Sequence, residues 1–218
     1  MLSVALVSTA VSAVTVLNRL GAVPLRDLAA SEHAVGEGRV WLLVSSAFVA
    51  DRPAVPSVAG LAVVGLAAVA FCGARLLWAA AALGHVGGTL SVYAALALAH
   101  AADPSLAGRA LGQADYGTSA IIAAWIGVIA WNVWRRGSGV AALGLCILSG
   151  LVGWLLRPDL DVLDTEHIVA LGVGIALAAT FGAVASAAGA AAASAADGAS
   201  SSAPALQPAR SRAARSPA

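Results

Sequence analysis

The sequence predicts an all-α, polytopic membrane protein with six transmembrane helices, and three observations support this fold class. Hydrophobic residues make up 60% of the 218 residues, and the mean hydropathy is +0.89. Charged residues make up only 11%, against about 25% in a typical soluble domain. The apolar residues also gather in runs of the length that crosses a bilayer. A soluble protein of this size has too small a core to hide so much apolar surface.

The first three expected helices occupy residues 2–17, 57–73 and 76–100. The first ends at Asn18 and Arg19, and it is interpreted as a span because no basic segment precedes it, as one does in a signal peptide. The run 57–101 is too long for one span, so we expect a break at Gly73-Ala74-Arg75. Residues 38–49 are apolar but too short to cross, which predicts an interfacial or re-entrant piece of the first loop.

The last three expected helices occupy residues 116–134, 139–156 and 167–188. Arg135 and Arg136 end the fourth, and Arg157 with Pro158 ends the fifth. The remaining chain is rich in Ala, Ser, Pro and Arg and is expected to be disordered, since it cannot build a core. The sequence therefore predicts a membrane domain at 1–188 and a tail at 189–218.

Arginines predict the orientation of these helices. Arg75 lies between the second and third expected helices, and Arg135 and Arg136 lie between the fourth and fifth. Three further arginines lie in the tail. The loops on the opposite side carry mostly acidic residues, although the long first loop also carries four arginines, namely Arg19, Arg26, Arg39 and Arg52. Positively charged loops favour the cytoplasmic side, so both termini and the tail are expected to be cytoplasmic.

Polar residues inside a bilayer cost free energy, so they are candidates for function. Ser119 and His167 lie near the starts of the fourth and sixth expected helices, which run in the same direction. They are therefore expected on the same side of the membrane and at similar depth. A histidine can take the proton of a serine hydroxyl and make it a nucleophile. Asp115 is expected to cap the fourth helix.

At these residues the sequence resembles the rhomboid family of intramembrane serine proteases, and most closely its divergent actinobacterial members. Gly117-Thr118-Ser119-Ala120 is similar to the Gly-x-Ser-Gly motif that opens the fourth helix of that family. The resemblance implies a six-helix rhomboid-like bundle in which Ser119 is the nucleophile and His167 is the base. It also implies a multi-pass protein of a bacterial plasma membrane that cleaves transmembrane proteins.

Other residues are expected to play supporting roles at such a site. Gly117 would let the backbone approach a substrate, and together with Thr118 and His85 it would support the oxyanion site. His85 alone is more typical of a structural histidine bonded to a neighbouring helix. Small residues would bring the fourth and sixth helices close together, namely Gly127, Ala170 and Gly174.

Two departures from the family pattern keep a second interpretation open. Ala120 replaces the last glycine of the motif, and residues 57–73 lack the His and Asn that help form the family's oxyanion hole. The alternative is a catalytically inactive rhomboid-like protein that binds transmembrane helices. A small transporter or channel is a third class, but the ionisable groups gather on one side of the membrane.

The remaining predictions concern partners and single side chains. The expected partners are membrane lipids and a transmembrane substrate or client protein. No cofactor, metal or nucleic acid is expected, because the chain has no metal-binding or phosphate-binding motif and its net charge is only +1. Cys72 and Cys146 are expected to be small apolar residues rather than a disulfide. Four tryptophans are expected to face lipid or its interface, namely Trp125, Trp131, Trp134 and Trp154.

Overall fold

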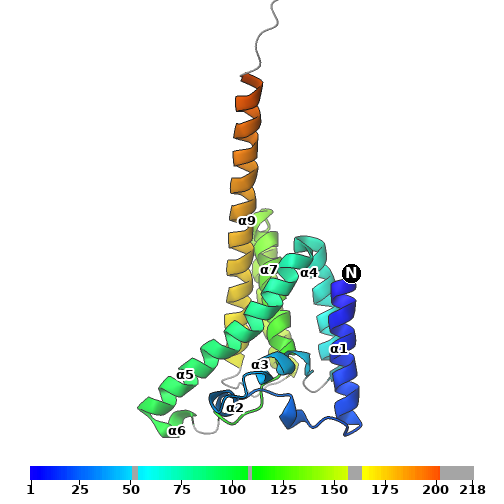
Figure 1. The fold of residues 1–218 in the computed structure, drawn as a ribbon, viewed down its shortest axis with the longest axis vertical. Coiled ribbons are helices and arrows are strands. Elements are labelled where there is room, and N and C mark those ends of the chain that lie inside the picture. Colours follow the sequence, from blue (N-terminus) through cyan, green and yellow to red (C-terminus); the bar gives the residue numbers. More distant parts are fainter. Residues whose placement is uncertain (51–53, 108–109, 157–163, 202–218) are drawn as a thin grey trace, which may run out of the picture. The chain divides into compact units, whose positions relative to one another are not determined.

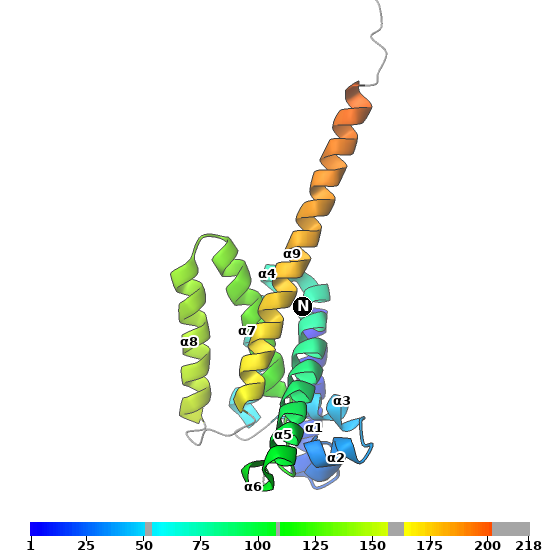
Figure 2. The same ribbon diagram turned by 90° about the vertical axis from the view of Figure 1, so that its left-hand side faces the viewer.

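The computed structural model describes residues 1–50, 54–107, 110–156 and 164–201, and all regular elements in these ranges are helices. The predicted all-α class is therefore confirmed. The elements are shown in Figures 1 and 2. In chain order they are α1 (Leu2–Arg19), η1 (Leu25–Asp27), α2 (Glu32–Gly36), α3 (Leu42–Ser45), η2 (Ser46–Phe48), α4 (Ala54–Ala82), η3 (Leu83–Gly87), α5 (Gly88–Ala102), α6 (Pro104–Ala107), α7 (Thr118–Arg135), α8 (Gly139–Leu156) and α9 (Asp164–Ser201).

Three stretches of the described residues are helical, long enough and apolar enough to cross a membrane. They are Leu2–Arg19, Ala54–Ala102 and Asp164–Val184. The second holds 49 residues, more than a single span needs. It is divided at Gly73, where φ is 79° and ψ is 167°, a backbone conformation that is essentially restricted to glycine. Figure 1 shows α4 turning and then running back towards α5. The break thus lies at the first of the three residues, 73–75, where it was expected.

Helix α7 forms the centre of the apolar core. Its residues are buried on several faces between Thr118 and Ala130, and they pack against apolar side chains of α1 and α4. Trp125 is fully buried and its indole N–H donates to Leu77 O at 3.0 Å. The prediction that Trp125 faces lipid is therefore wrong, because the ring fills the space between α7 and α4. Trp134, near the end of α7, is exposed as expected.

Small residues let α7 and α9 approach each other closely. A Cβ atom added to Gly127 would overlap Leu171 O, and one added to Gly174 would overlap Ala124 O. Ala170 is buried on the same helix as Gly174. The backbones therefore meet at positions where the sequence places its small residues, and larger side chains would separate the two helices.

Segment η3 interrupts the helix that continues from α4 into α5. It is one turn of π-helix, a widened turn that is frequent at functional sites. It contains His85, which is buried. The expected third helix, 76–100, is thus present but changes its winding in the middle.

Helix α9 is longer than the expected sixth span. It starts at Asp164, three positions before residue 167, and it ends at Ser201. The predicted tail starts at 189, yet the helix continues past that point because the sequence there is rich in alanine, the strongest helix former. Residues 202–218 lie outside the described residues. The chain divides into two units, Met1–Phe181 and Gly182–Ala218, and the site described below belongs entirely to the first.

Candidate functional site

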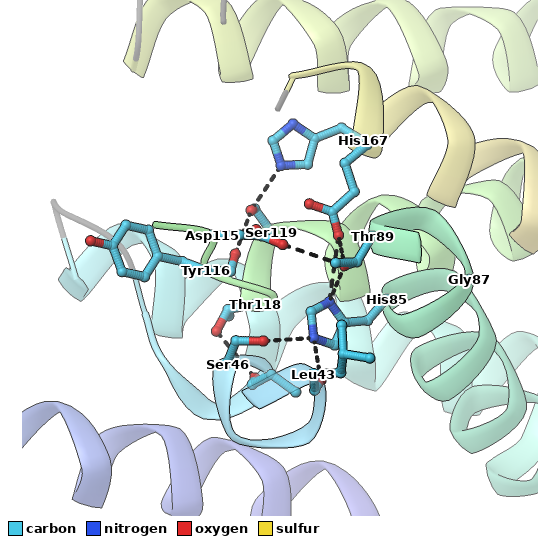
Figure 3. A network of polar contacts seen from close by, with 12 residues as sticks. Leu43, Ser46, His85, Gly87, Thr89, Asp115, Tyr116, Thr118, Ser119 and His167 are labelled. Carbon is cyan, nitrogen blue, oxygen red and sulfur yellow. Dashed lines mark hydrogen bonds and ion pairs between the residues drawn. The ribbon is translucent and has the colours of Figure 1, made fainter. Parts of the chain in front are cut away.

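The structure brings Ser119 and His167 into contact. Ser119 lies in the first turn of α7, and His167 lies in the first turn of α9. The two side chains point toward each other, with His167 Nε2 2.8 Å from Ser119 Oγ (Figure 3). Residues that are 48 positions apart in the chain thus form the pair that the parity of the helices predicts.

Asp164 lies on the other side of the His167 ring. Its Oδ1 is 3.6 Å from His167 Nδ1, and the two residues are three positions apart in the chain. A carboxylate at Nδ1 favours the ring form that carries its proton there. The lone pair of Nε2 is then directed at the Ser119 hydroxyl, which suits Nε2 to accept that proton. Sequence reasoning missed this role, although the i, i+3 spacing within one helical turn was visible.

The side chains of the site are partly exposed. The side chains of His167 and Asp164 are 31% and 29% exposed, and Ser119 is half-buried. The Ile121 N–H donates to Gly117 O at 3.1 Å. The Ser119 amide lies two residues before the Ile121 amide, in the first turn of α7. Backbone N–H groups in the first turn of a helix have no carbonyl acceptor within that helix. Such amides, at the positive end of the helix dipole, favour a developing negative charge.

Gly117 and Thr118 connect the start of α7 to the first loop. The Gly117 N–H donates to Ser46 O at 3.0 Å, and the Thr118 hydroxyl donates to Val49 O at 2.7 Å. A Cβ atom at Gly117 would overlap the ring of His85. These two hydrogen bonds therefore hold the backbone of the turn that carries Ser119 in place. Position 117 must be glycine, because the His85 imidazole occupies the space of a Cβ atom.

His85 forms part of a buried polar network. Its Nε2 is 2.9 Å from Leu43 O and 3.1 Å from Ser46 Oγ. Because a carbonyl only accepts, Nε2 carries a proton and donates it to this side. Nδ1 is 3.4 Å from Thr89 Oγ1 and 3.5 Å from Glu166 Oε1. Both ring nitrogens thus face protein groups, as Figure 3 shows for Ser46, Leu43 and Thr89. The ring also lies against Gly117, where it fills the space that a Cβ atom would need.

Asp115 joins the same network and does not cap α7. The cap position is Gly117, and no side chain forms a hydrogen bond to the cap. The predicted capping role is therefore wrong, because the Asp115 carboxyl faces α5 instead. It accepts hydrogen bonds from the hydroxyls of Thr89 and Tyr93, each at 3.4 Å. Burial and the neighbouring Glu166 carboxyl raise the pKa of Asp115 to about 7.

The arrangement suits nucleophilic chemistry at one hydroxyl. It has a serine, a histidine that can take its proton, and a carboxylate beyond the histidine, which are the three groups of a serine hydrolase site. Within the residues that the structure describes, no group of three or more His, Cys, Asp and Glu is placed to hold a metal ion. Comparisons with protein-family models, curated proteins and solved structures give no match to this chain.

Proposed function

We propose that this chain is a rhomboid-like intramembrane serine protease, and the observation that carries the proposal is the 2.8 Å contact between Ser119 Oγ and His167 Nε2. The proposed protein is a six-helix bundle in a bacterial plasma membrane with both termini in the cytoplasm. Its substrates are transmembrane proteins whose helix unwinds near the outer face. The resemblance of the Gly117–Ala120 segment to the family motif supports this substrate class.

In the proposed reaction, His167 Nε2 takes the proton of Ser119 as Oγ attacks the carbonyl carbon of the scissile peptide bond. The carbonyl oxygen becomes an oxyanion, which the Ser119 backbone N–H stabilises. His167 then gives the proton to the leaving amine, and the peptide bond breaks to leave an acyl ester on Ser119. Water, activated by the same histidine, hydrolyses the ester. Asp164 stabilises the imidazolium during both steps.

The test of this proposal is covalent labelling by a fluorophosphonate, which reacts with activated serines. We expect the full chain, purified in detergent, to be labelled in its folded state. The Ser119→Ala variant should lose the label, because the nucleophile is gone. The His167→Gln variant should be labelled about 100-fold more slowly, since a general base contributes at least that much.

A matched control keeps this experiment specific. Ser91 is exposed and its hydroxyl donates to Gly87 O within its own helix. The Ser91→Ala variant should therefore be labelled at the wild-type rate. Labelling that persists in Ser119→Ala would contradict the proposed nucleophile.

A specific observation favours one alternative, a catalytically inactive protein that binds transmembrane helices. Residues 57–73 contain neither His nor Asn, and loss of one oxyanion donor costs about 100- to 1000-fold in rate. In this alternative, Ser119 and His167 form a structural hydrogen bond. Folded wild-type protein that takes no label would favour it over the protease.

A further inference from the structure

A pair of buried carboxyl groups lies beside the Ser119–His167 contact. Asp115 and Glu166 are only 4% and 2% exposed. One hydroxyl, that of Thr89, is 2.5 Å from Glu166 Oε1 and 3.4 Å from Asp115 Oδ2. Asp115 belongs to the segment that leads into α7, and Glu166 immediately precedes His167 in α9. The pair therefore connects the two segments that carry the serine and the histidine.

This pair has few hydrogen-bond donors for two ionised carboxylates. The Thr89 hydroxyl carries one hydrogen, and the Tyr93 hydroxyl supplies one more to Asp115. In the part of the chain that the structure describes, the one basic group beside either carboxyl is His85, 3.5 Å from Glu166 Oε1, and it forms an ion pair only when its ring is protonated. Two negative charges in such a dry place would repel strongly. One proton held between them removes one charge and adds a donor, as in other carboxyl pairs that share a site.

We propose that Asp115 and Glu166 share one proton, and that this proton-bridged pair positions His167 against Ser119. The bridge ties the first turn of α9 to the segment that precedes α7. Both acids are positioning residues, since they act through the helices that carry His167 and Ser119. The positioning role rests on the proposed function, whereas the shared proton is inferred from the burial of both carboxyl groups and from the Thr89 hydroxyl that both of them contact.

The surroundings of the bridge determine how it responds to pH. The titratable groups that face Asp115 are His85 from η3, Tyr93 from α5 and Glu166 from α9, and Glu32 of α2 lies beyond Tyr93. The pKa of Asp115 is raised from 3.8 to about 7, so the folded protein keeps a proton that the unfolded chain releases. Stability from this group is therefore fully present below about pH 4 and is lost as the pH rises through about 7.

The first test is thermal unfolding of the full chain in detergent between pH 4 and pH 9. The melting temperature of the wild type should fall by about 5 °C or more across this range relative to Asp115→Asn. The reason is that an amide can donate to Glu166 without titrating. Glu166→Gln should flatten the profile in the same way. Asp27→Asn, which changes an exposed carboxyl, should keep the wild-type profile. Coincident profiles of wild type and Asp115→Asn would overturn the proton bridge.

The second test is the rate of fluorophosphonate labelling over the same pH range. The wild-type rate should fall above about pH 7 as the bridge loses its proton, and Asp115→Asn should remove this alkaline fall. A fall of equal size in Asp115→Asn would overturn the positioning role but leave the bridge. If the folded wild type takes no label at any pH, the proposed function and the positioning role both fail. The melting temperatures then still decide whether the bridge exists.

Discussion

At the scale of single residues, the site depends on how the His167 ring is held. Asp164 is within 3.6 Å of Nδ1 and Ser119 is within 2.8 Å of Nε2. The ring thus has a different partner at each nitrogen. A proton is favoured at Nδ1, beside the Asp164 carboxylate, and Nε2 faces the Ser119 hydroxyl whose proton it accepts. Removing the charge at Nδ1 should therefore weaken Nε2 as a base and leave the fold intact.

We expect Asp164→Asn to slow fluorophosphonate labelling of Ser119 by about 10-fold or more, because an amide stabilises the imidazolium far less than a carboxylate does. The melting temperature should change little, since both side chains are partly exposed and such pairs contribute about 1 kcal/mol or less to stability. Asp103→Asn, at an exposed carboxyl, serves as the control. Equal labelling rates in both variants would show that Asp164 plays no part.

Single residues also show where sequence reasoning stops. Ser119 and His167 could be paired from helix order alone, because both start helices that run in one direction. Asp115 was expected to cap α7, since an acidic residue just before a helix is typical of a cap. Its true partners, Thr89 and Tyr93, lie more than twenty positions away. No local pattern indicates a contact of that kind.

At the scale of elements, α7 and α9 are held together by backbone contact. Gly174 tolerates no Cβ atom, because Ala124 O occupies the space, whereas nothing lies within 4 Å of a Cβ atom at Gly172. The two glycines are two positions apart on one helix, so they differ in packing and not in helix propensity. They form a matched pair for a test of this contact.

We expect Gly174→Ala to lower stability by about 1–3 kcal/mol, the usual cost of overpacking a close contact. Labelling of Ser119 should also slow, because α9 carries His167 away from α7. Gly172→Ala should match or exceed the wild-type melting temperature, since alanine favours a helix by about 1 kcal/mol over glycine. The measurement is thermal unfolding in detergent. A similar loss in both variants would mean that the contact between the helices is not the cause.

The elements themselves were largely predictable from the sequence. Apolar runs and charged breaks give the bounds of the long helices to within a few residues, except the end of α9 at Ser201, which was expected at residue 188. The break at Gly73 follows from the length of one run. Two features were not predicted. Helix α9 continues past residue 188, where a tail without a core was expected, because alanine is the strongest helix former. The π-turn η3 has no sequence signature, because it depends on the packing around His85.

At the scale of the whole molecule, the proposed orientation places the two ends of α7 on opposite sides of the membrane. Gln113 precedes α7 and Ser138 follows it, so fusions at these positions test one helix. Alkaline phosphatase needs an oxidising compartment for its disulfides. We expect a fusion after Gln113 to be active and a fusion after Ser138 to be inactive. The reverse pattern would place the serine and histidine at the cytoplasmic face and contradict the proposed topology.

The π-turn η3 has a consequence for how the gene can change. One turn of π-helix holds an additional residue compared with an α turn, and each residue turns an α-helix by about 100°. Deleting one residue from Leu83–Gly87 would restore regular winding and rotate one flank against the other. Either His85 would then leave Leu43 or Thr89 would leave Glu166. Leu83 is exposed and nothing lies within 4 Å of a Cβ atom at Gly87, so these two positions should accept substitutions more readily than the segment accepts a change of its length by one codon.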